Sequence, residues 1–458
     1  MNNPKPDGIY NVKELGAGKT IVLGLQHMFA MFGATVLVPI LTGLDVSTTL
    51  LFAGLGTLLF HLLTKRKVPA FLGSSFAFLG GYAAITRLPD GTLEPEKIPY
   101  ACFGVACAGL VYLLLAGLIK LFSAKKVMKF FPPIVTGPII IAIGLTLSKS
   151  AIDNCAANWW VALAAILVVI ICNIWGKGMI KIVPILIGVV VSYIVGVCMG
   201  EVDFSAVVDA AWIGLPIRKE MTVLALFDNF DASLLITSVI TIMPIALATI
   251  VEHVGDISAI SSTTGINYIK DPGLHRTLLG DGLATTLASL FGAPANTTYG
   301  ENTGVLNLSK VYDPFVVRLA AIFAILFSFC PKFSAVIQTM PTATVGGISL
   351  ILYGMISAVG VRNIVETQVD FTKSRNVIIA ALILVLSIGV NYSTAGAIAF
   401  SIGKVTISLS GLAIGALAGI ILNAILPGKD YVFDDDEPSD TGVNFQVGDR
   451  QKEKNKTK

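Results

Sequence analysis

Long apolar runs, separated by short polar segments, fill most of the chain. A helix that spans the hydrocarbon core of a bilayer needs about 20 mainly apolar residues. Runs of about this length lie at 20–43, 47–64, 100–123, 134–150, 157–175, 179–199, 232–255, 315–330, 341–360, 375–391 and 405–426. Three further runs are shorter or interrupted, at 68–86, 277–291 and 293–311. The pattern therefore predicts fourteen membrane crossings.

Two of the interrupted runs contain polar, glycine-rich stretches at the depth of the membrane. The sequence reads "VPAFLGSSFAFLGG" at 68–81 and "GAPANTTYGENTG" at 292–304. In hydrocarbon, irregular backbone survives only where protein buries it or where it lines a wet cavity. Each stretch has a proline, then small residues, then an aromatic residue. We therefore expect a short extended piece joined to a half-helix in each.

These two stretches fall in the third and tenth crossings, seven apart. A second pair matches at the same separation: "PPIVTGPIII" at 132–141 and "PTATVGGISL" at 341–350. Because seven is odd, the two halves would cross the membrane in opposite directions. Broken helices at matching positions of inverted halves indicate the binding site of a transporter. The alternative is that membrane helices are often rich in Gly and Pro without any site.

Composition and charge agree with a polytopic membrane protein. Of the 458 residues, 54% are hydrophobic and 13% are charged, against about 25% charged in a soluble domain. If the N-terminus is cytoplasmic, all but seven of the 32 Lys and Arg fall on the cytoplasmic side. Both termini are then cytoplasmic, and residues 428–458 form a solvated tail. The six cysteines lack CxxC spacing, which predicts buried small side chains rather than a metal site.

Ionisable residues inside crossings are costly and usually functional. Glu252 and Asp256 are four apart in "EHVGD", so a helix would place them on one face. Glu301 lies in the tenth crossing and His27 in the first. The alternative for Glu252 and Glu301 is an acid that is paired for folding or lies at the water boundary. For His253, an interface or packing role is favoured. The four histidines form no HExxH or comparable cluster, which argues against an intramembrane metal hydrolase.

Six motifs in order resemble one known family. They are "QHMFAMFGATVLVPILTG", "VPAFLGSSFAF", "EHVGD", "DPGLHR", "NTTYGENTGV" and "GGISLILYG", within about residues 18–427. This set resembles the nucleobase–cation symporters of the nucleobase–ascorbate transporter family, and within it the bacterial uracil permeases.

The resemblance implies an all-α polytopic membrane protein with fourteen transmembrane segments in two inverted repeats of seven. Short antiparallel strands would lie in the broken spans 3 and 10. It further implies a core domain at 18–123 and 232–330, a gate domain at 124–200 and 335–427, and the tail at 428–458.

The resemblance also implies a substrate site. Two carboxylates would bind the nucleobase, two backbone segments would contact its polar edge, and three side chains would form its walls. In that order the residues are Glu252 and Glu301, Phe76 and Gly300, and Ala34, Tyr299 and Tyr353.

Ion coupling is less closely defined. The family implies roles for Glu252 and Glu301, and Asp256 stands where the best-known uracil permeases have a histidine. His27 is a further candidate, either for the ion pathway or for helix-to-helix hydrogen bonding. We expect H⁺ as the co-transported ion, with Na⁺ as an alternative, and no cofactor.

The expected function is secondary active uptake of uracil by cation symport in the cell membrane. A carrier of xanthine or other purines is the main alternative, because the family includes both. A passive channel or an intramembrane enzyme is the alternative of a different class. The family suggests a homodimer formed through the gate domains, with the lipid bilayer and the nucleobase as the other partners and no nucleic acid.

Overall fold

The computed structural model describes residues 8–88, 91–228, 230–394, 396–402, 405–429 and 431. The side chains at positions 182, 301 and 401–408 lie outside this description. The predicted site side chain of Glu301 and nearly all of the predicted tail therefore lie outside the described residues.

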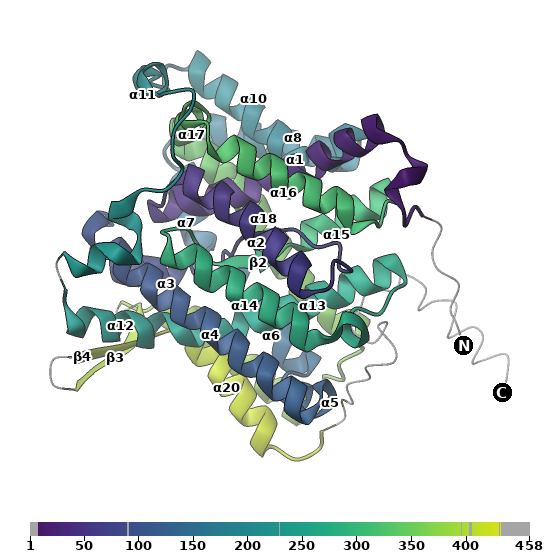
Figure 1. The fold of residues 1–458 in the computed structure, drawn as a ribbon. Coiled ribbons are helices and arrows are strands. Elements are labelled where there is room, and N and C mark those ends of the chain that lie inside the picture. The colour runs from purple at the N-terminus through teal and green to yellow at the C-terminus, as the bar shows by residue number, and fades with distance from the viewer. Residues whose placement is uncertain are drawn as a thin grey trace.

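Among the described residues, seven helical segments are long and apolar enough to cross a membrane. They are Ala17–Thr42, Val46–Leu63, Pro95–Phe122, Pro133–Cys155, Ala232–Thr264, Thr342–Glu366 and Ser374–Asn391. A bent pair, Pro314–Ser328 with Pro331–Gln338, adds an eighth if its two helices are one span. Shorter apolar helices are Trp159–Ile174, Pro184–Cys198 and Gly411–Ile425. The chain thus folds as a helical bundle of membrane-spanning length (Figure 1).

The individual elements follow the order shown in Figure 1. The long helices are α1 Ala17–Thr42, α2 Val46–Leu63, α4 Ile98–Phe122, α6 Pro133–Thr146, α8 Trp159–Ile174, α10 Pro184–Cys198, α13 Ala246–Thr264, α14 Leu274–Leu290, α16 Pro314–Ser328, α18 Thr342–Glu366, α19 Ser374–Asn391 and α20 Gly411–Ile425. The shorter helices are α3 Leu79–Thr86, α5 Ala124–Val127, α7 Ser148–Cys155, α9 Met179–Ile182, α11 Ser205–Asp209, α12 Ala232–Ile242, α15 Gly300–Ser309 and α17 Pro331–Gln338.

Local sequence signals set several of these helix boundaries. Asp45 caps α2 by accepting a hydrogen bond from the backbone N–H of Thr48 at 2.8 Å. Pro132 and Pro341 occupy the cap positions before α6 and α18, which are the two helices of the matching pair. Pro244 lies in the single 3₁₀ turn that separates α12 from α13, because proline cannot donate the helical hydrogen bond.

Two short strands lie in the polar, glycine-rich stretches. Strand β1, Leu72–Ser74, pairs antiparallel with β2, Asn296–Thr298, with Gly73 opposite Thr297. Both strands are fully buried, and each precedes a short helix, α3 or α15. Side chains of the surrounding helices complete the backbone hydrogen bonds: Thr57 accepts from Leu72 N at 2.9 Å, and Thr285 donates to Asn296 O at 2.6 Å. Irregular backbone at this depth is therefore satisfied within the protein.

A second antiparallel pair was not expected. Strand β3, Ala397–Ile402, pairs with β4, Val405–Ser410, and the hairpin lies beside α12 at the edge of the bundle (Figure 1). The prediction of a helix beginning at residue 405 is wrong for these first six residues. The segment "VTISLS" alternates apolar with hydroxyl-bearing residues and begins with three β-branched residues, a pattern that suits a strand.

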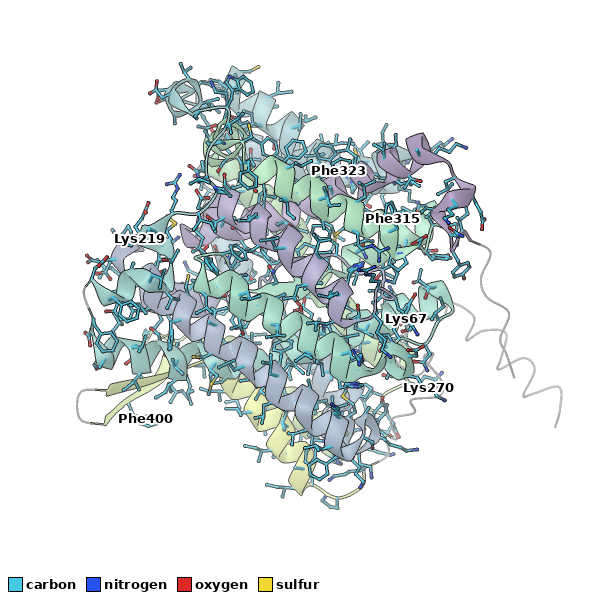
Figure 2. The ribbon with its side chains drawn as sticks, viewed as in Figure 1. Lys67, Lys219, Lys270, Phe315, Phe323 and Phe400 are labelled. Carbon is cyan, nitrogen blue, oxygen red and sulfur yellow. The ribbon has the colours of Figure 1, made fainter. Side chains whose placement is uncertain are left out.

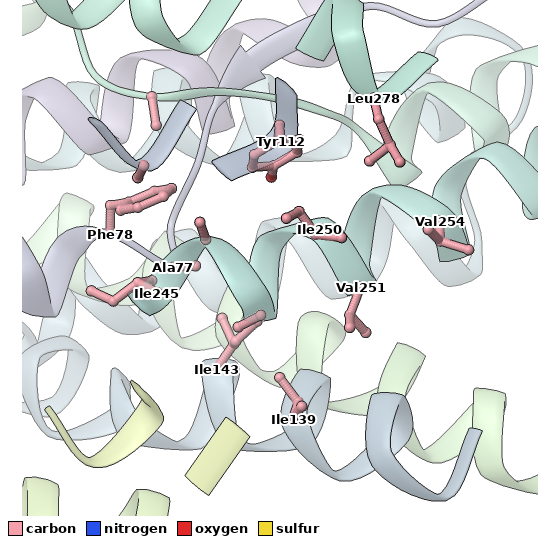
Figure 3. Packing of buried hydrophobic residues seen from close by; sticks show 14 of the residues in the cluster. Ala77, Phe78, Tyr112, Ile139, Ile143, Ile245, Ile250, Val251, Val254 and Leu278 are labelled. Carbon is pink, nitrogen blue, oxygen red and sulfur yellow. The ribbon is translucent and has the colours of Figure 1, made fainter. Parts of the chain in front are cut away.

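The helices around α13 form the main core. Figure 3 shows Tyr112 and Leu278, from α4 and α14, on one side of α13, and Ile139 and Ile143, from α6, on the other. Small residues let helices approach closely, as between Gly109 of α4 and the backbone of α14. Helix α13, which carries Glu252 and Asp256, is therefore held between two other groups of helices.

Basic side chains gather at opposite edges of the bundle. In Figure 2, Lys67 and Lys270 lie at one edge and Lys219 at the other. Lys67 forms an ion pair with Asp271 at that first edge. A cytoplasmic N-terminus would place Lys67 and Lys270 on the cytoplasmic side and Lys219 on the outer side, and this orientation stays a prediction.

Candidate functional site

A cavity of about 330 Å³ lies where α13, β2 and α15 face α18. Phe76, after β1, and Ile140, from α6, close it. The lining residues are Phe76, Ile140, Glu252, Gly255, Asp256, Ala259, Thr263, Thr297, Thr298, Tyr299, Gly300, Thr303, Gly304, Asn307, Met355, Ile356, Val359, Arg362, Asn363 and Glu366. Ligand pockets typically measure roughly 300–1,000 Å³, so this cavity suits a small molecule.

Two acidic side chains of α13 face the cavity. Glu252 is partly buried, Asp256 is 9% exposed, and both belong to the lining. Their four-residue separation places them on the same face of the helix, as the sequence predicted. The hydroxyl of Thr298 donates a hydrogen bond to Asp256 Oδ2 at 3.0 Å. An ionised carboxylate only accepts hydrogen bonds, so this wall offers acceptors to a ligand.

The start of α15 lies next to these acids. Tyr299 is the cap residue and Gly300 the first helical residue, and the side chain of Tyr299 makes no capping hydrogen bond to this end. A Cβ at Gly300 would lie 3.3 Å from Asp256 Oδ1, so the carboxylate approaches the bare backbone closely. The first N–H groups of a helix lack intrahelical partners and attract electronegative atoms. This end of the cavity therefore combines acceptors with backbone donors.

Aromatic side chains form the apolar wall. The Phe76 ring meets the Tyr353 ring edge to face, with 5.8 Å between centroids. Tyr299 donates its hydroxyl hydrogen to Ser74 O at 2.9 Å, which ties the cavity wall to β1. Tyr353 and Ala34 are buried in the same apolar cluster as Phe76 but do not belong to the cavity lining.

His27 lies behind the cavity rather than in its lining. Its ring nitrogen Nδ1 lies 3.1 Å from Asn302 Oδ1, and Asn302 donates from Nδ2 to Pro69 O at 2.7 Å. Both side chains are fully buried. The structure thus gives His27 a contact that joins α1 to α15, which is the helix-to-helix alternative of the sequence analysis.

Several lining residues were missed by the sequence analysis. Arg362, Asn363 and Glu366 form a polar edge on α18, and Arg362 Nε lies 2.7 Å from Glu366 Oε1. Their spacing with Val359 places them on one helix face. This spacing indicates a cavity lining only once the neighbours of α18 are known. Thr298 was also missed, because a threonine in a short strand carries no signal of its own.

His253 was interpreted as a packing residue. Its ring does lie against Phe60 and Tyr112, with centroids 6.4 Å away from each. It also forms a fully buried contact with Asp281, with His253 Nδ1 2.9 Å from Asp281 Oδ2. The packing interpretation is therefore incomplete.

Comparisons with known proteins identify the class. Residues 18–396 match the family model Xan_ur_permease, described as "Permease family". The chain belongs to this permease family, the nucleobase–ascorbate transporters, and the family resemblance is confirmed. It is accordingly a multi-pass membrane transport protein and not an enzyme.

Similar relatives are uracil permeases. The uracil permease of Bacillus caldolyticus is 41% identical, over 90% of this chain and 93% of that protein. Those of Bacillus subtilis (strain 168) and Escherichia coli (strain K12) are 38% and 36% identical, each over 89% of this chain.

Solved structures of other transporters share the fold. The transmembrane domain of the cyanobacterial bicarbonate transporter BicA aligns with a TM-score of 0.61 at 16% identity, covering 82% of this chain and 97% of that one. SLC26A9 aligns with a TM-score of 0.61 at 12% identity, covering 91% of this chain and 66% of that one. At this identity the likeness concerns the fold alone, and one fold can carry different substrates.

Proposed function

We propose that the protein takes up uracil by cation symport, with H⁺ as the coupled ion. The observation that carries the proposal is the pairing of Glu252 and Asp256 with the uncapped start of α15 in one small cavity. Uracil is flat and neutral, with N–H donors and carbonyl acceptors on its edge. Carboxylates match the donors, and free backbone N–H groups match the acceptors. The uracil permeases among the relatives point to the same substrate.

Within this proposal each predicted site residue has a role. Glu252 accepts from a ring N–H, and the backbone at Phe76 and Gly300 contacts the polar edge. The three side chains Tyr299, Tyr353 and Ala34 form or support the walls. Glu301 is proposed as the second carboxylate from its place in the motif, one residue after Gly300.

Proton coupling would use the same acids. A carboxylate in a water-poor cavity readily takes up a proton and becomes neutral, because burial disfavours the charged form. Asp256 is the candidate for this exchange because it is more buried than Glu252 and adjoins the start of α15. The purine carrier remains the second candidate for the substrate. An acid at position 301, where the xanthine and urate carriers of the family commonly have Gln, favours a pyrimidine.

The architecture proposed with this function is fourteen spans in two inverted repeats. Its support is the antiparallel pairing of β1 with β2, and the matching proline caps of α6 and α18. The cavity then lies between a core domain, which includes α13 and α15, and a gate domain, which includes α18. Cytoplasmic termini and a homodimer through the gate domains belong to the same proposal.

The test is a competition panel in proteoliposomes. Labelled uracil uptake is measured against unlabelled uracil, thymine, xanthine, uric acid and ascorbate, with and without an inward proton gradient or sodium. We expect uracil to compete best and the proton gradient to drive accumulation that a protonophore abolishes. Preferential competition by xanthine would replace uracil with a purine. Equilibration without accumulation under every gradient would indicate a passive pathway instead.

A further inference from the structure

A continuous chain of polar side chains runs from the cavity into the protein interior. It begins at Asp256, whose Oδ2 accepts from Thr298 Oγ1 at 3.0 Å. Thr298 Oγ1 lies 3.3 Å from His253 Nδ1, and the same nitrogen lies 2.9 Å from Asp281 Oδ2. These four side chains come from α13, β2 and α14. Of the four, Asp256 and Thr298 line the cavity.

The inner end of this chain is sealed from water. His253, Asp281 and Thr298 are 0%, 0% and 1% exposed. Phe60 of α2 and Tyr112 of α4 cover the imidazole ring. Among the described residues, His253 Nε2 has no hydrogen-bond partner. Nδ1 is therefore the ring nitrogen through which His253 contacts both Asp281 and Thr298.

Titratable groups from several neighbouring elements surround the pair. Tyr112 faces it from α4 through the contact between its ring and that of His253. From α2 the pair meets Phe60, whose ring neighbours that of His61. Strand β2 contributes Thr298, and helix α15 carries Glu301, whose side chain lies outside the described part.

Packing alone does not explain why an acid and an imidazole are buried together. Removing charged groups from water costs several kcal/mol per ion, and apolar residues of similar volume often stabilise a core as well or better. A pair that is connected to a cavity by a hydroxyl group can instead serve to hold and move a proton. The three distances above supply that connection.

We propose that His253 and Asp281 form a proton store that the Thr298 hydroxyl connects to Asp256. In the loaded state His253 is an imidazolium beside ionised Asp281. For transfer outward, Nδ1 gives its proton to Thr298 Oγ1 as the hydroxyl gives its own proton to Asp256 Oδ2. The products are neutral His253, unchanged Thr298 and protonated Asp256. Asp256 exchanges its proton with water in the cavity, and the reverse sequence reloads the store.

This proposal rests on the proposed function in one respect. A protonated Asp256 is a weaker acceptor for a ligand N–H than the carboxylate. Moving the stored proton onto Asp256 would therefore favour release of the ligand, and the relay would link ligand release to proton movement.

The test compares Thr298→Val with Thr298→Ser, which differ in the hydroxyl. We expect gradient-driven uptake to fall by about tenfold or more in T298V, a larger loss than any change in the dissociation constant for uracil, which is measured in parallel. T298S, which keeps the hydroxyl, should recover most of the coupled uptake. Wild-type dependence on the proton gradient in T298V would overturn the relay.

A second arm needs no ligand. Infrared pH titration of the purified protein follows the carbonyl band of a protonated carboxyl group, and we expect Asp256→Asn to remove that band. In Asp281→Asn, which keeps the shape of the side chain, and in T298V, the pH at which the band appears should shift from the wild-type value. Unshifted titrations in both would overturn the relay. If wild-type protein binds no uracil, the proposed substrate fails, while these titrations still decide the relay.

Discussion

Asn302 connects three separate parts of the chain through one amide. Its oxygen contacts His27 of α1, and its nitrogen donates to the carbonyl of Pro69 just before β1. These contacts fix the start of α15 relative to both segments. The acidic wall and the backbone donors are then held in one geometry relative to a ligand. A fixed geometry is what lets a site distinguish ligands by the hydrogen-bonding groups on their edges.

Asn302→Ala should therefore destabilise the protein. The substitution leaves His27 Nδ1 and the Pro69 carbonyl buried without this partner, and an unsatisfied buried group costs about 1–3 kcal/mol. We expect a lower midpoint in thermal or denaturant unfolding of the purified protein. Asn307→Ala on the same helix is the matched control, because Asn307 is exposed. Equal stability of the two variants would contradict this role for Asn302.

At the residue scale the sequence predicted much of the cavity lining. Phe76, Glu252, Asp256, Tyr299 and Gly300 all belong to it. The spacing of the two acids along a helix signalled Glu252 and Asp256, whereas Phe76, Tyr299 and Gly300 were implied by the family resemblance. The roles of these residues in transport stay predictions.

At the element scale, the pairing of strands β1 and β2 depends on a close approach between the backbone of β1 and the side chain that follows β2. Gly73 lies against the ring of Tyr299, and a Cβ at this position would overlap that ring and lie 2.8 Å from Thr35 Oγ1. Tyr299 itself is fixed by its hydrogen bond to Ser74 O. The glycine is thus required by packing against the cavity wall.

Gly73→Ala should abolish or strongly reduce uptake. The added methyl group must displace Tyr299 or the strand, and overpacking of this kind typically costs about 1–3 kcal/mol. Uptake in proteoliposomes, together with the yield of folded protein, measures the effect. Gly117→Ala is the control: nothing lies within 4 Å of its Cβ position in α4. Normal uptake by G73A would show that Tyr299 can move without consequence.

The sequence predicted an extended piece in each of these two stretches, and it missed the hairpin of β3 and β4. The first two were signalled by prolines and small residues at the depth of the membrane. The hairpin was hidden because "VTISLS" adjoins the apolar run of α20, and a short apolar segment suits a strand or a helix equally.

At the scale of the whole molecule, the cavity lies between elements that the proposal assigns to two domains. If transport moves these two proposed domains relative to each other, we expect α1 to move relative to α10. Gly33 of α1 and Ile185 of α10 are in tight contact, with 3.5 Å between the Cβ position of Gly33 and Ile185 Cβ. Disulfides have Cβ separations of about 3.5–4.5 Å, so this pair is suited to cross-linking.

The double variant Gly33→Cys with Ile185→Cys should lose uptake on oxidation and regain it on reduction. It is made in a background that lacks the six native cysteines. The control pair is Gly196→Cys with Pro341→Cys, also 3.5 Å apart at Cβ, within the proposed gate domain. Oxidation of the control should leave uptake largely intact. Full uptake by the cross-linked first pair would argue against relative movement of the two domains.

The sequence by itself determined that this is a polytopic membrane protein with two interrupted apolar runs and an acidic face on one helix. These features follow from composition and from the spacing of residues along one segment, so no knowledge of neighbours is needed. The tertiary structure alone decided that Thr298 reaches Asp256, that His253 meets Asp281, and that α18 brings a polar edge to the cavity. Such contacts join segments far apart in the chain, and they depend on how helices pack rather than on any local pattern.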